Sequence, residues 1–240
     1  MHTKRQPIVA SELYEEATDL YRRAFFPLAS TAGGIALVIN GLLFLNPDRL
    51  VLNVAWATLV NFFAAAMISA ALILPMVIEL RATGATSPAT RIAGLRDHGK
   101  HVVLATIPLA IANGLFIFTI LGIALAIFIS VRFGLFAAAA VVEDEDVTDS
   151  LTRSWELTQG LLLRTSGVLL GAIAPFVVAT VALAWLDLSY RVTFVAITIA
   201  EGLVIPFVLI VILLLFEDYR TLESEPDDFG PSTSPPKTSL

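Results

Sequence analysis

Two ionisable residues, Arg132 and Glu201, lie inside long apolar stretches of the sequence. Arg132 is the single charge in 102–142, and Glu201 lies within the apolar run 192–216. Ionisable groups inside a membrane span are rare, and they mark either a transport pathway or a buried pair. The sequence therefore presents two alternatives, a structural ion pair or a polar path through the membrane.

The depths of the two charges favour pairing. At a rise of about 1.5 Å per residue, Arg132 lies about 15 Å beyond a turn placed at Gly122. By the same rise, Glu201 lies about 14 Å beyond Val192. We expect the two side chains to pair near the middle of the bilayer, where a lone charge costs about 2.5–3.5 kcal/mol. In the alternative, the two side chains join Asn61 and Asn113 along a polar path.

Other reactive chemistry is sparse in this sequence. The chain has no cysteine, which excludes disulfides and thiolate metal sites. His98 and His101 lie beside Asp97, but this spacing is not a known metal-ligand pattern. Nucleophile-elbow, zinc-protease and phosphate-loop motifs are absent. We expect no enzymatic activity, no bound metal and no cofactor. The net charge of −6 comes largely from 143–149 and the segment after 216, so no nucleic-acid partner is expected either.

Long charge-free stretches define the elements that carry these residues. Only 15% of the residues are charged, against about 25% in soluble domains. Each stretch reaches or exceeds the roughly 20 apolar residues that a membrane-spanning helix needs. Residues 102–142 are too long for one span and must fold back, with the turn placed near 119–122. Asn113-Gly114 is the weaker alternative, because the first arm would then be short. The sequence predicts six spans at 24–45, 51–80, 102–121, 122–142, 161–186 and 192–216.

Two shorter segments have the pattern of amphipathic helices at the membrane surface. In 11–23, apolar residues recur at helical spacing opposite four carboxylates, and in 148–159 the residues Val147, Leu151 and Trp155 are four apart. Residues 217–240 are rich in Pro, Ser, Thr and acidic residues, which is typical of a disordered tail. The expected fold is all-α, a polytopic transmembrane bundle of about six spans plus two interfacial helices. Its parts are an N-terminal segment 1–23, a membrane domain 24–216 and a tail 217–240.

Basic residues set the expected orientation. In the six-span arrangement one side of the membrane carries twelve Lys and Arg residues, whereas the other carries only Arg49 and Arg191. Because basic loops stay in the cytoplasm, both termini are expected there, in a multi-pass protein of the cell membrane. The external loops are a few residues long, so function is expected in the membrane or on the cytoplasmic face.

One segment carries a family resemblance. The fourth predicted span ends in Ala140-Val-Val-Glu143 and is followed by Arg153-Ser154-Trp155-Glu-Leu-Thr-Gln-Gly160. Together with the polar start at 11–23 and the ending Phe216-Glu-Asp-Tyr-Arg220, this resembles the membrane-domain family of glycerophosphodiester phosphodiesterases and related multi-pass proteins. The likeness covers roughly 11–220. The acidic run Asp144-Glu-Asp146 departs from the family pattern.

The resemblance implies a membrane domain alone. The phosphodiesterase activity of such fusion proteins belongs to a separate (β/α) barrel, which needs about 250 residues and exceeds this chain. Glu143, Arg153, Ser154 and Trp155 are candidates for a docking surface towards a lipid headgroup or a partner protein. The competing interpretation is an interfacial helix with Trp155 at the headgroup level.

The expected function is therefore a non-catalytic helical bundle that binds lipid or another membrane protein. The alternative is a small transporter or channel subunit that uses Arg132 and Glu201. A cavity joining the in-span polar residues to both sides would favour transport, whereas a packed interior would favour the interaction protein. The sequence does not identify a ligand, a partner or a homo-oligomeric state.

Overall fold

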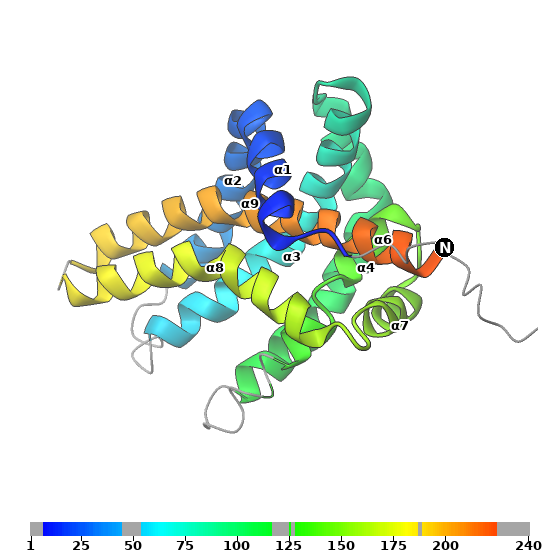
Figure 1. The fold of residues 1–240 in the computed structure, drawn as a ribbon. Helices are drawn as coiled ribbons and strands as arrows, with labels where there is room; N and C mark the ends of the chain where they lie inside the picture. Colours follow the sequence, from blue (N-terminus) through cyan, green and yellow to red (C-terminus); the bar gives the residue numbers. More distant parts are fainter. Residues whose placement is uncertain (1–6, 45–53, 117–124, 126–127, 187–188, 225–240) are drawn as a thin grey trace, which may run out of the picture.

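A computed structural model of the protein describes residues 7–44, 54–116, 125, 128–186 and 189–224. Across this part of the chain all regular structure is helical, which confirms the all-α prediction (Figure 1). The helices are α1 Ala10–Arg23, α2 Phe25–Phe44, α3 Val54–Thr83, α4 Pro88–Phe116, α6 Phe136–Val142, α7 Val147–Leu157, α8 Leu162–Trp185 and α9 Tyr190–Ser224.

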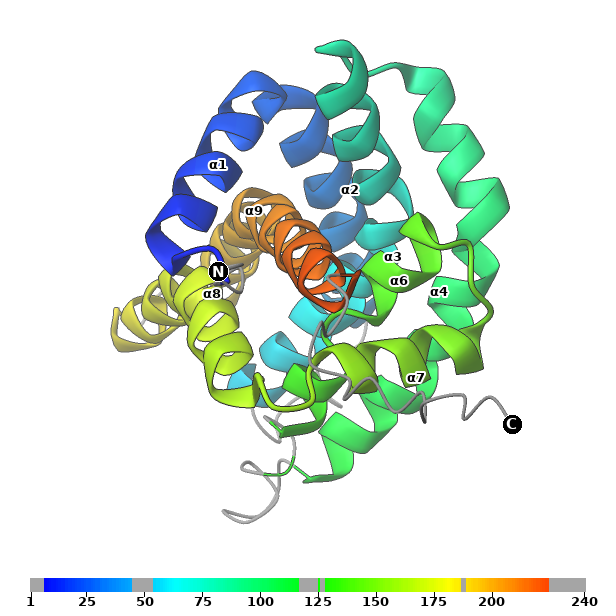
Figure 2. The same ribbon diagram turned by 45° about the vertical axis from the view of Figure 1, so that its right-hand side comes forward.

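Helix α9 forms the centre of the structure. Seen close to end-on, it is surrounded by α1, α2, α3, α6 and α8 (Figure 2). Its 35 residues correspond to about 52 Å of helix, more than the roughly 30 Å thickness of a bilayer core. The other helices are therefore arranged around a single long axis.

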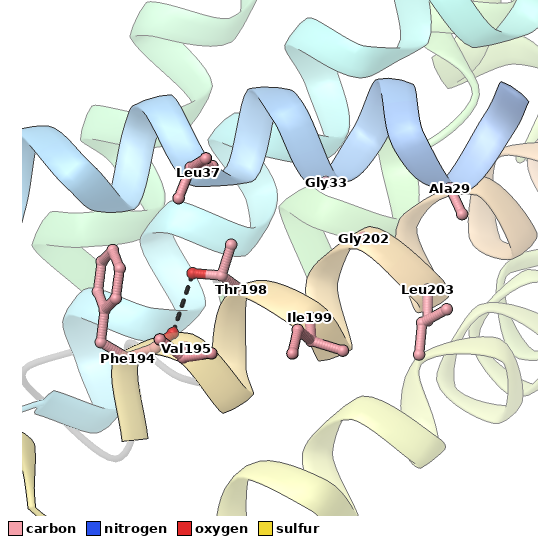
Figure 3. A pocket seen from close by; sticks show the side chains of 9 residues that line it. All are labelled: Ala29, Gly33, Leu37, Phe194, Val195, Thr198, Ile199, Gly202 and Leu203. Carbon is pink, nitrogen blue, oxygen red and sulfur yellow. Dashed lines mark hydrogen bonds between the residues drawn. The ribbon is translucent and has the colours of Figure 1, made fainter. Parts of the chain in front are cut away.

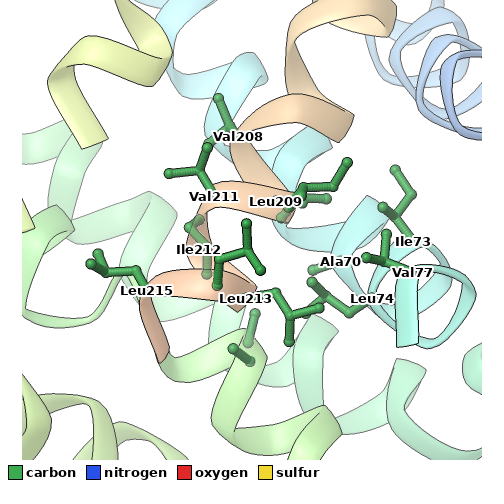
Figure 4. Packing of buried hydrophobic residues seen from close by; sticks show 14 of the residues in the cluster. Ala70, Ile73, Leu74, Val77, Val208, Leu209, Val211, Ile212, Leu213 and Leu215 are labelled. Carbon is green, nitrogen blue, oxygen red and sulfur yellow. The ribbon is translucent and has the colours of Figure 1, made fainter. Parts of the chain in front are cut away.

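The second half of α9 is packed on all sides by protein. Every residue from Val208 to Phe216 is buried, as is Tyr219. Figure 4 shows part of this stretch, including Val208, Leu209 and Leu213. On α3, Ile73, Leu74 and Val77 meet this stretch. Helices in a bilayer gain little from the hydrophobic effect on association, so this contact depends on close van der Waals packing.

Helix α1 has the predicted amphipathic pattern but a different partner. Leu13, Ala17 and Leu20 are buried, at the predicted helical spacing. These residues belong to the protein core and pack towards α9, whereas the sequence predicts an apolar face turned to lipid. A bend of 89° at Ala24 separates α1 from α2. The bend lets α1 follow the second half of α9 while α2 crosses the first half.

The segment between α3 and α4 is shorter than predicted. The sequence predicts a polar loop over 81–101, but α4 already begins at Pro88. The Ser87 hydroxyl accepts a hydrogen bond from the Thr90 N–H at 3.3 Å. The Ser87 N–H in turn donates to the Glu79 carboxylate at 2.8 Å. Proline in the first turn of a helix and a serine before it are both favourable start signals. Both signals are present in the sequence, and the segment forms a helix although many of its residues are polar.

The predicted fourth span is interrupted. Residues 128–132 are helical, 133–135 form a turn, and α6 then begins at Phe136. At Gly134 an added Cβ would lie 2.8 Å from the Ser130 carbonyl oxygen, so the turn leaves no room for a side chain there. The predicted turn at 119–122 between the third and fourth spans lies outside the described residues.

The described helices give fewer membrane spans than the predicted six. Three segments are long and apolar enough to cross a membrane, namely Phe62–Thr83, Leu162–Leu183 and Arg191–Ser224. A fourth is obtained if Ala10–Arg23 and Phe25–Gly41 form one bent span. Predicted spans 102–121 and 122–142 run through residues that the structure does not describe, and the second of them is broken at 133–135.

Small residues allow two close contacts. The sequence contains the pattern Gly167-Val-Leu-Leu-Gly171 in α8, which is typical of close helix packing. A Cβ at Gly171 would overlap the Tyr14 hydroxyl, which donates to the Val168 carbonyl at 2.6 Å, whereas a Cβ at Gly167 would meet nothing. Of the two glycines, only Gly171 therefore makes a close contact with another helix, through the Tyr14 side chain of α1.

The α2–α9 crossing brings two helix backbones together. A Cβ at Gly202 would lie 2.9 Å from the Gly33 Cα and 3.2 Å from its nitrogen. Both atoms belong to the backbone, so the two helices would have to separate to accept any side chain at Gly202. The neighbouring Gly34 has nothing within 4 Å of its Cβ position.

These contacts predict opposite effects for two glycine substitutions. Gly202→Ala should destabilise the protein by about 1–3 kcal/mol, because overpacking forces the backbones apart. Gly34→Ala should be neutral or slightly stabilising, since alanine favours a helix over glycine by up to about 1 kcal/mol. Thermal unfolding in detergent measures both. Equal midpoints for the two variants would contradict the crossing.

Candidate functional site

Glu201 lies in a small polar cluster between α2 and α9. Its side chain is fully buried, and Oε2 accepts a hydrogen bond of 2.5 Å from Asn40 Nδ2. The same Asn40 nitrogen donates to Thr198 Oγ1 at 3.3 Å. The second carboxyl oxygen, Oε1, is buried without a hydrogen-bond partner. The cluster therefore joins two helices through one amide and one carboxyl group.

Arg132 lies elsewhere, at the end of the 128–132 helix beside α7. Its guanidinium stacks on Trp155 at 4.5 Å from the ring centroid and lies 5.5 Å from that of Phe128. Nη1 also donates to the Trp155 carbonyl and to Thr158 Oγ1, both at 3.4 Å. Cation–π contacts of this kind contribute about 0.5–2 kcal/mol.

The predicted ion pair between Arg132 and Glu201 is therefore wrong in this structure. Each residue has its own partners, and neither is a partner of the other. The depth argument assumed an unbroken helix from 122 to 142. The turn at 133–135 ends the helix directly after Arg132, and this places the guanidinium against α7.

Ser154 explains how the chain tolerates that turn. The Ser154 hydroxyl donates to the Arg132 carbonyl at 2.8 Å and accepts the Leu135 N–H at 3.2 Å. A break in a helix frees backbone groups that must find other partners when buried. Ser154 is fully buried and supplies both partners from α7. The Ser154 hydroxyl therefore bonds to the backbone on both sides of the turn. Because it is buried, it does not form part of an exposed docking surface.

Arg153 ties three elements together through carboxylates. Its Nε lies 3.0 Å from Glu143 at the end of α6, and its Nη2 lies 2.6 Å from Glu223 in α9. Arg220 adds a 3.4 Å contact to Glu143. Hydrogen bonds that Arg153 donates to Glu223, and further to Glu143, raise the pKa of Arg153 despite its partial burial. The guanidinium therefore stays charged.

The four predicted motif residues thus divide into two groups. The structure brings Glu143, Arg153 and Ser154 into contacts that hold α6, α7 and α9 together. Trp155 is 41% exposed and is the one motif side chain with a free surface. Only Trp155, together with Arg132, retains the geometry expected for a contact with lipid headgroups.

A second ion-pair cluster was not predicted from the sequence. Arg164 of α8 lies 2.7 Å from the buried Asp218 of α9 and donates to the Ile8 carbonyl at 2.6 Å. Asp218 in turn accepts the Ile8 N–H at 3.3 Å. Arg81 of α3 contacts both Glu217 of α9 and Glu16 of α1. The C-terminal part of α9 is thereby joined to α1, α3 and α8.

His98 and His101 lie in α4 and face the acidic segment rather than Asp97. His98 Nδ1 lies 3.7 Å from Asp144, and His101 Nδ1 lies 3.8 Å from Asp146. Within the described residues no group of three or more potential ligand side chains is arranged to hold a metal ion. The contacts link α4 to the segment between α6 and α7.

An apolar groove runs beside the polar cluster, between α2 and α9 (Figure 3). Its volume is about 350 Å³. Ala29, Gly33 and Leu37 form one wall, and Val195, Ile199 and Leu203 form the other. Phe194, Thr198 and Gly202 complete the lining. Thr198 belongs to both features, since it lines the groove and accepts from Asn40.

Asn40 and Gly202 are the site residues that sequence reasoning missed. Asn40 carried a usable signal, because it is a polar side chain within the charge-free stretch 24–45. Gly202 directly follows Glu201 and could have been read as a crossing point for a neighbouring helix. The sequence does not indicate that Asn40 contacts Glu201 or that Gly202 contacts Gly33, because the partners lie on helices far apart in the chain. Asn40 and Glu201, for example, are 161 residues apart.

A pair of double-mutant cycles tests the assignment of Glu201. Asn40→Leu with Glu201→Leu should show a coupling of about 0.5–3 kcal/mol, because the side chains are in contact. Arg132→Leu with Glu201→Leu should be additive within about 0.5 kcal/mol. Unfolding of the detergent-solubilised variants by SDS gives both values. Strong coupling in the second cycle would restore the ion pair.

Ser154→Ala should destabilise the protein by about 1–3 kcal/mol, because it removes the partner of the buried Leu135 N–H and of the partly buried Arg132 carbonyl. Thr152→Ala is the matched control, since that exposed hydroxyl bonds only to the Thr148 carbonyl of its own helix. The control should stay within about 0.5 kcal/mol of the parent. Thermal unfolding midpoints measure the stability of both variants. A Ser154→Ala variant as stable as the control would refute this role of Ser154.

Comparisons of the chain with protein-family models, curated proteins and solved structures give no significant match. The resemblance carried by Glu143 and 153–160 accordingly stays a prediction from the sequence.

Proposed function

We propose that this protein is a non-catalytic membrane protein that binds lipid or another membrane protein within the bilayer. In this proposal it has six spans, both termini are cytoplasmic, and the membrane is the cell membrane. Three to four helices are long and apolar enough to cross a membrane, and they support the proposal that this is a membrane protein.

One observation carries the proposal. The interior around the second half of α9 is filled by side chains, and Arg132 and Glu201 are held in separate places. A transport path through the bundle would need polar groups that follow one another across the membrane. In the described residues the in-span polar cluster at Glu201 is instead followed by apolar packing from Ile205 to Phe216.

The outer surface gives the proposal its second support. Large apolar side chains are exposed along α2, α8 and α9, among them Leu37, Val178 and Ile199. Exposed apolar surface of this extent indicates contact with a membrane or a partner. On α8 and the first half of α9 the exposed apolar side chains lie on the candidate membrane spans themselves, as expected for surface covered by lipid.

A transporter or channel subunit is the alternative, and one observation favours it. Glu201 Oε1 is buried without a partner inside a candidate span. Reconstitution into liposomes separates the two functions. Ion or solute flux that is lost in Glu201→Gln would favour transport, whereas absence of flux with specific co-purification of a lipid or protein partner would favour the proposal.

The topology has its own test in this cysteine-free chain. Single cysteines at Pro47, Ser189 and Ser234 should divide into two groups when intact cells are treated with an impermeant thiol reagent. The first two should react from outside, because the proposed topology puts these positions in short external loops, and the third should react only after lysis. The parent chain is the unlabelled control. Labelling of Ser234→Cys in intact cells would exclude an even number of spans with a cytoplasmic N-terminus.

A further inference from the structure

We infer that the groove between α2 and α9 binds one acyl chain of a phospholipid, with Arg191 at the lipid phosphate. This inference deepens the proposed function and rests on it, since it selects lipid as the ligand and names the site. The groove is bordered by Ala29, Gly33 and Leu37 on α2 and by residues from Phe194 to Leu203 on α9.

The chemistry of the lining selects an apolar ligand. Thr198 carries the single polar side chain of the nine lining residues. Its hydroxyl already donates to the Phe194 carbonyl at 2.9 Å and accepts from Asn40. No lining side chain therefore requires a polar partner from the ligand, and hydrocarbon satisfies the groove without leaving a buried polar group unpaired.

The dimensions of the groove fit one acyl chain. From Phe194 to Leu203 the helix rises about 14 Å, which is about half of a 30 Å hydrocarbon core and so the depth of one leaflet. The groove volume is about 350 Å³. The groove therefore matches the length of one acyl chain in a single leaflet.

The small residues point in the same direction. Close helix contacts in membranes use glycine and alanine at the interface. Here Gly33 and Gly202 already face each other across the α2–α9 crossing. The walls that remain open are formed by Leu37, Val195 and Ile199, whose branched side chains would hold an incoming backbone away.

Arg191 supplies a charge at the end of the groove. It is exposed, and it precedes Phe194 and Val195 by three and four residues, so it lies on the same face of α9. In the proposed topology this end of α9 is at the outer surface, where lipid phosphates lie. An arginine at that level is suited to a phosphate oxygen, and each such charge contributes about 1 kcal/mol to binding of an anionic lipid.

The test uses delipidated protein in detergent, titrated with palmitoyl-oleoyl phosphatidylglycerol and followed by native mass spectrometry. Val195→Trp fills the groove and should remove one bound lipid. Val178→Trp places the same side chain on the exposed face of α8, away from the groove, and should leave the number of bound lipids unchanged. Leu37→Trp on the opposite wall repeats the test should Val195→Trp fail to fold.

The headgroup contact is tested separately. Arg191→Gln should weaken binding of the retained lipid about fivefold, the factor that corresponds to about 1 kcal/mol. Arg96→Gln removes an exposed charge from α4, a helix that does not line the groove, and should have no effect.

The outcomes separate this inference from the proposed function. Equal lipid retention in Val195→Trp, Leu37→Trp and the parent would overturn the groove site while leaving lipid binding elsewhere intact. A parent dimer that becomes monomeric in both tryptophan variants would assign the groove face to a second copy instead. Absence of any retained lipid or partner, together with Glu201-dependent flux, would refute the proposed function itself.

Discussion

The burial of α9 is the constraint on which the rest of the structure depends. From Val208 to Phe216 the helix is apolar on every face and buried on every face, because the helices around α9 pack closely against it. Acidic residues follow immediately, and the arginines of α3 and α8 meet them at Glu217 and Asp218. The same helix thus organises the apolar interior through packing and its end through ion pairs.

Several polar groups inside this bundle are satisfied by nearby side chains, and these contacts connect the helices. Ser154 supplies partners for the backbone at the 133–135 turn, and Asn40 supplies one for Glu201. Two tyrosines of α1 donate to backbone carbonyls, Tyr14 to Val168 and Tyr21 to Leu203. In a bilayer an unpaired backbone group costs several kcal/mol, so such side chains fix the positions of helices. The motif that suggested a docking surface is largely of this kind.

The surfaces that remain available are apolar and face outward. They comprise α8, the first half of α9 and the groove between α9 and α2. Trp155 with the stacked Arg132 adds an amphipathic patch at α7. An apolar face beside a charged or aromatic rim is how proteins recognise lipids, and this pattern is the basis of the proposed function.

The sequence by itself determined the helical class, most helix positions and the two amphipathic helices, because apolar periodicity and charge-free length are local properties. It also indicated that Arg132 and Glu201 needed partners. Only the tertiary structure decided who those partners are. A turn of three residues at 133–135 moves Arg132 to Trp155, and the glycine crossing brings Asn40 to Glu201. Such pairings depend on where distant helices cross, and a periodic pattern contains no information about crossing points.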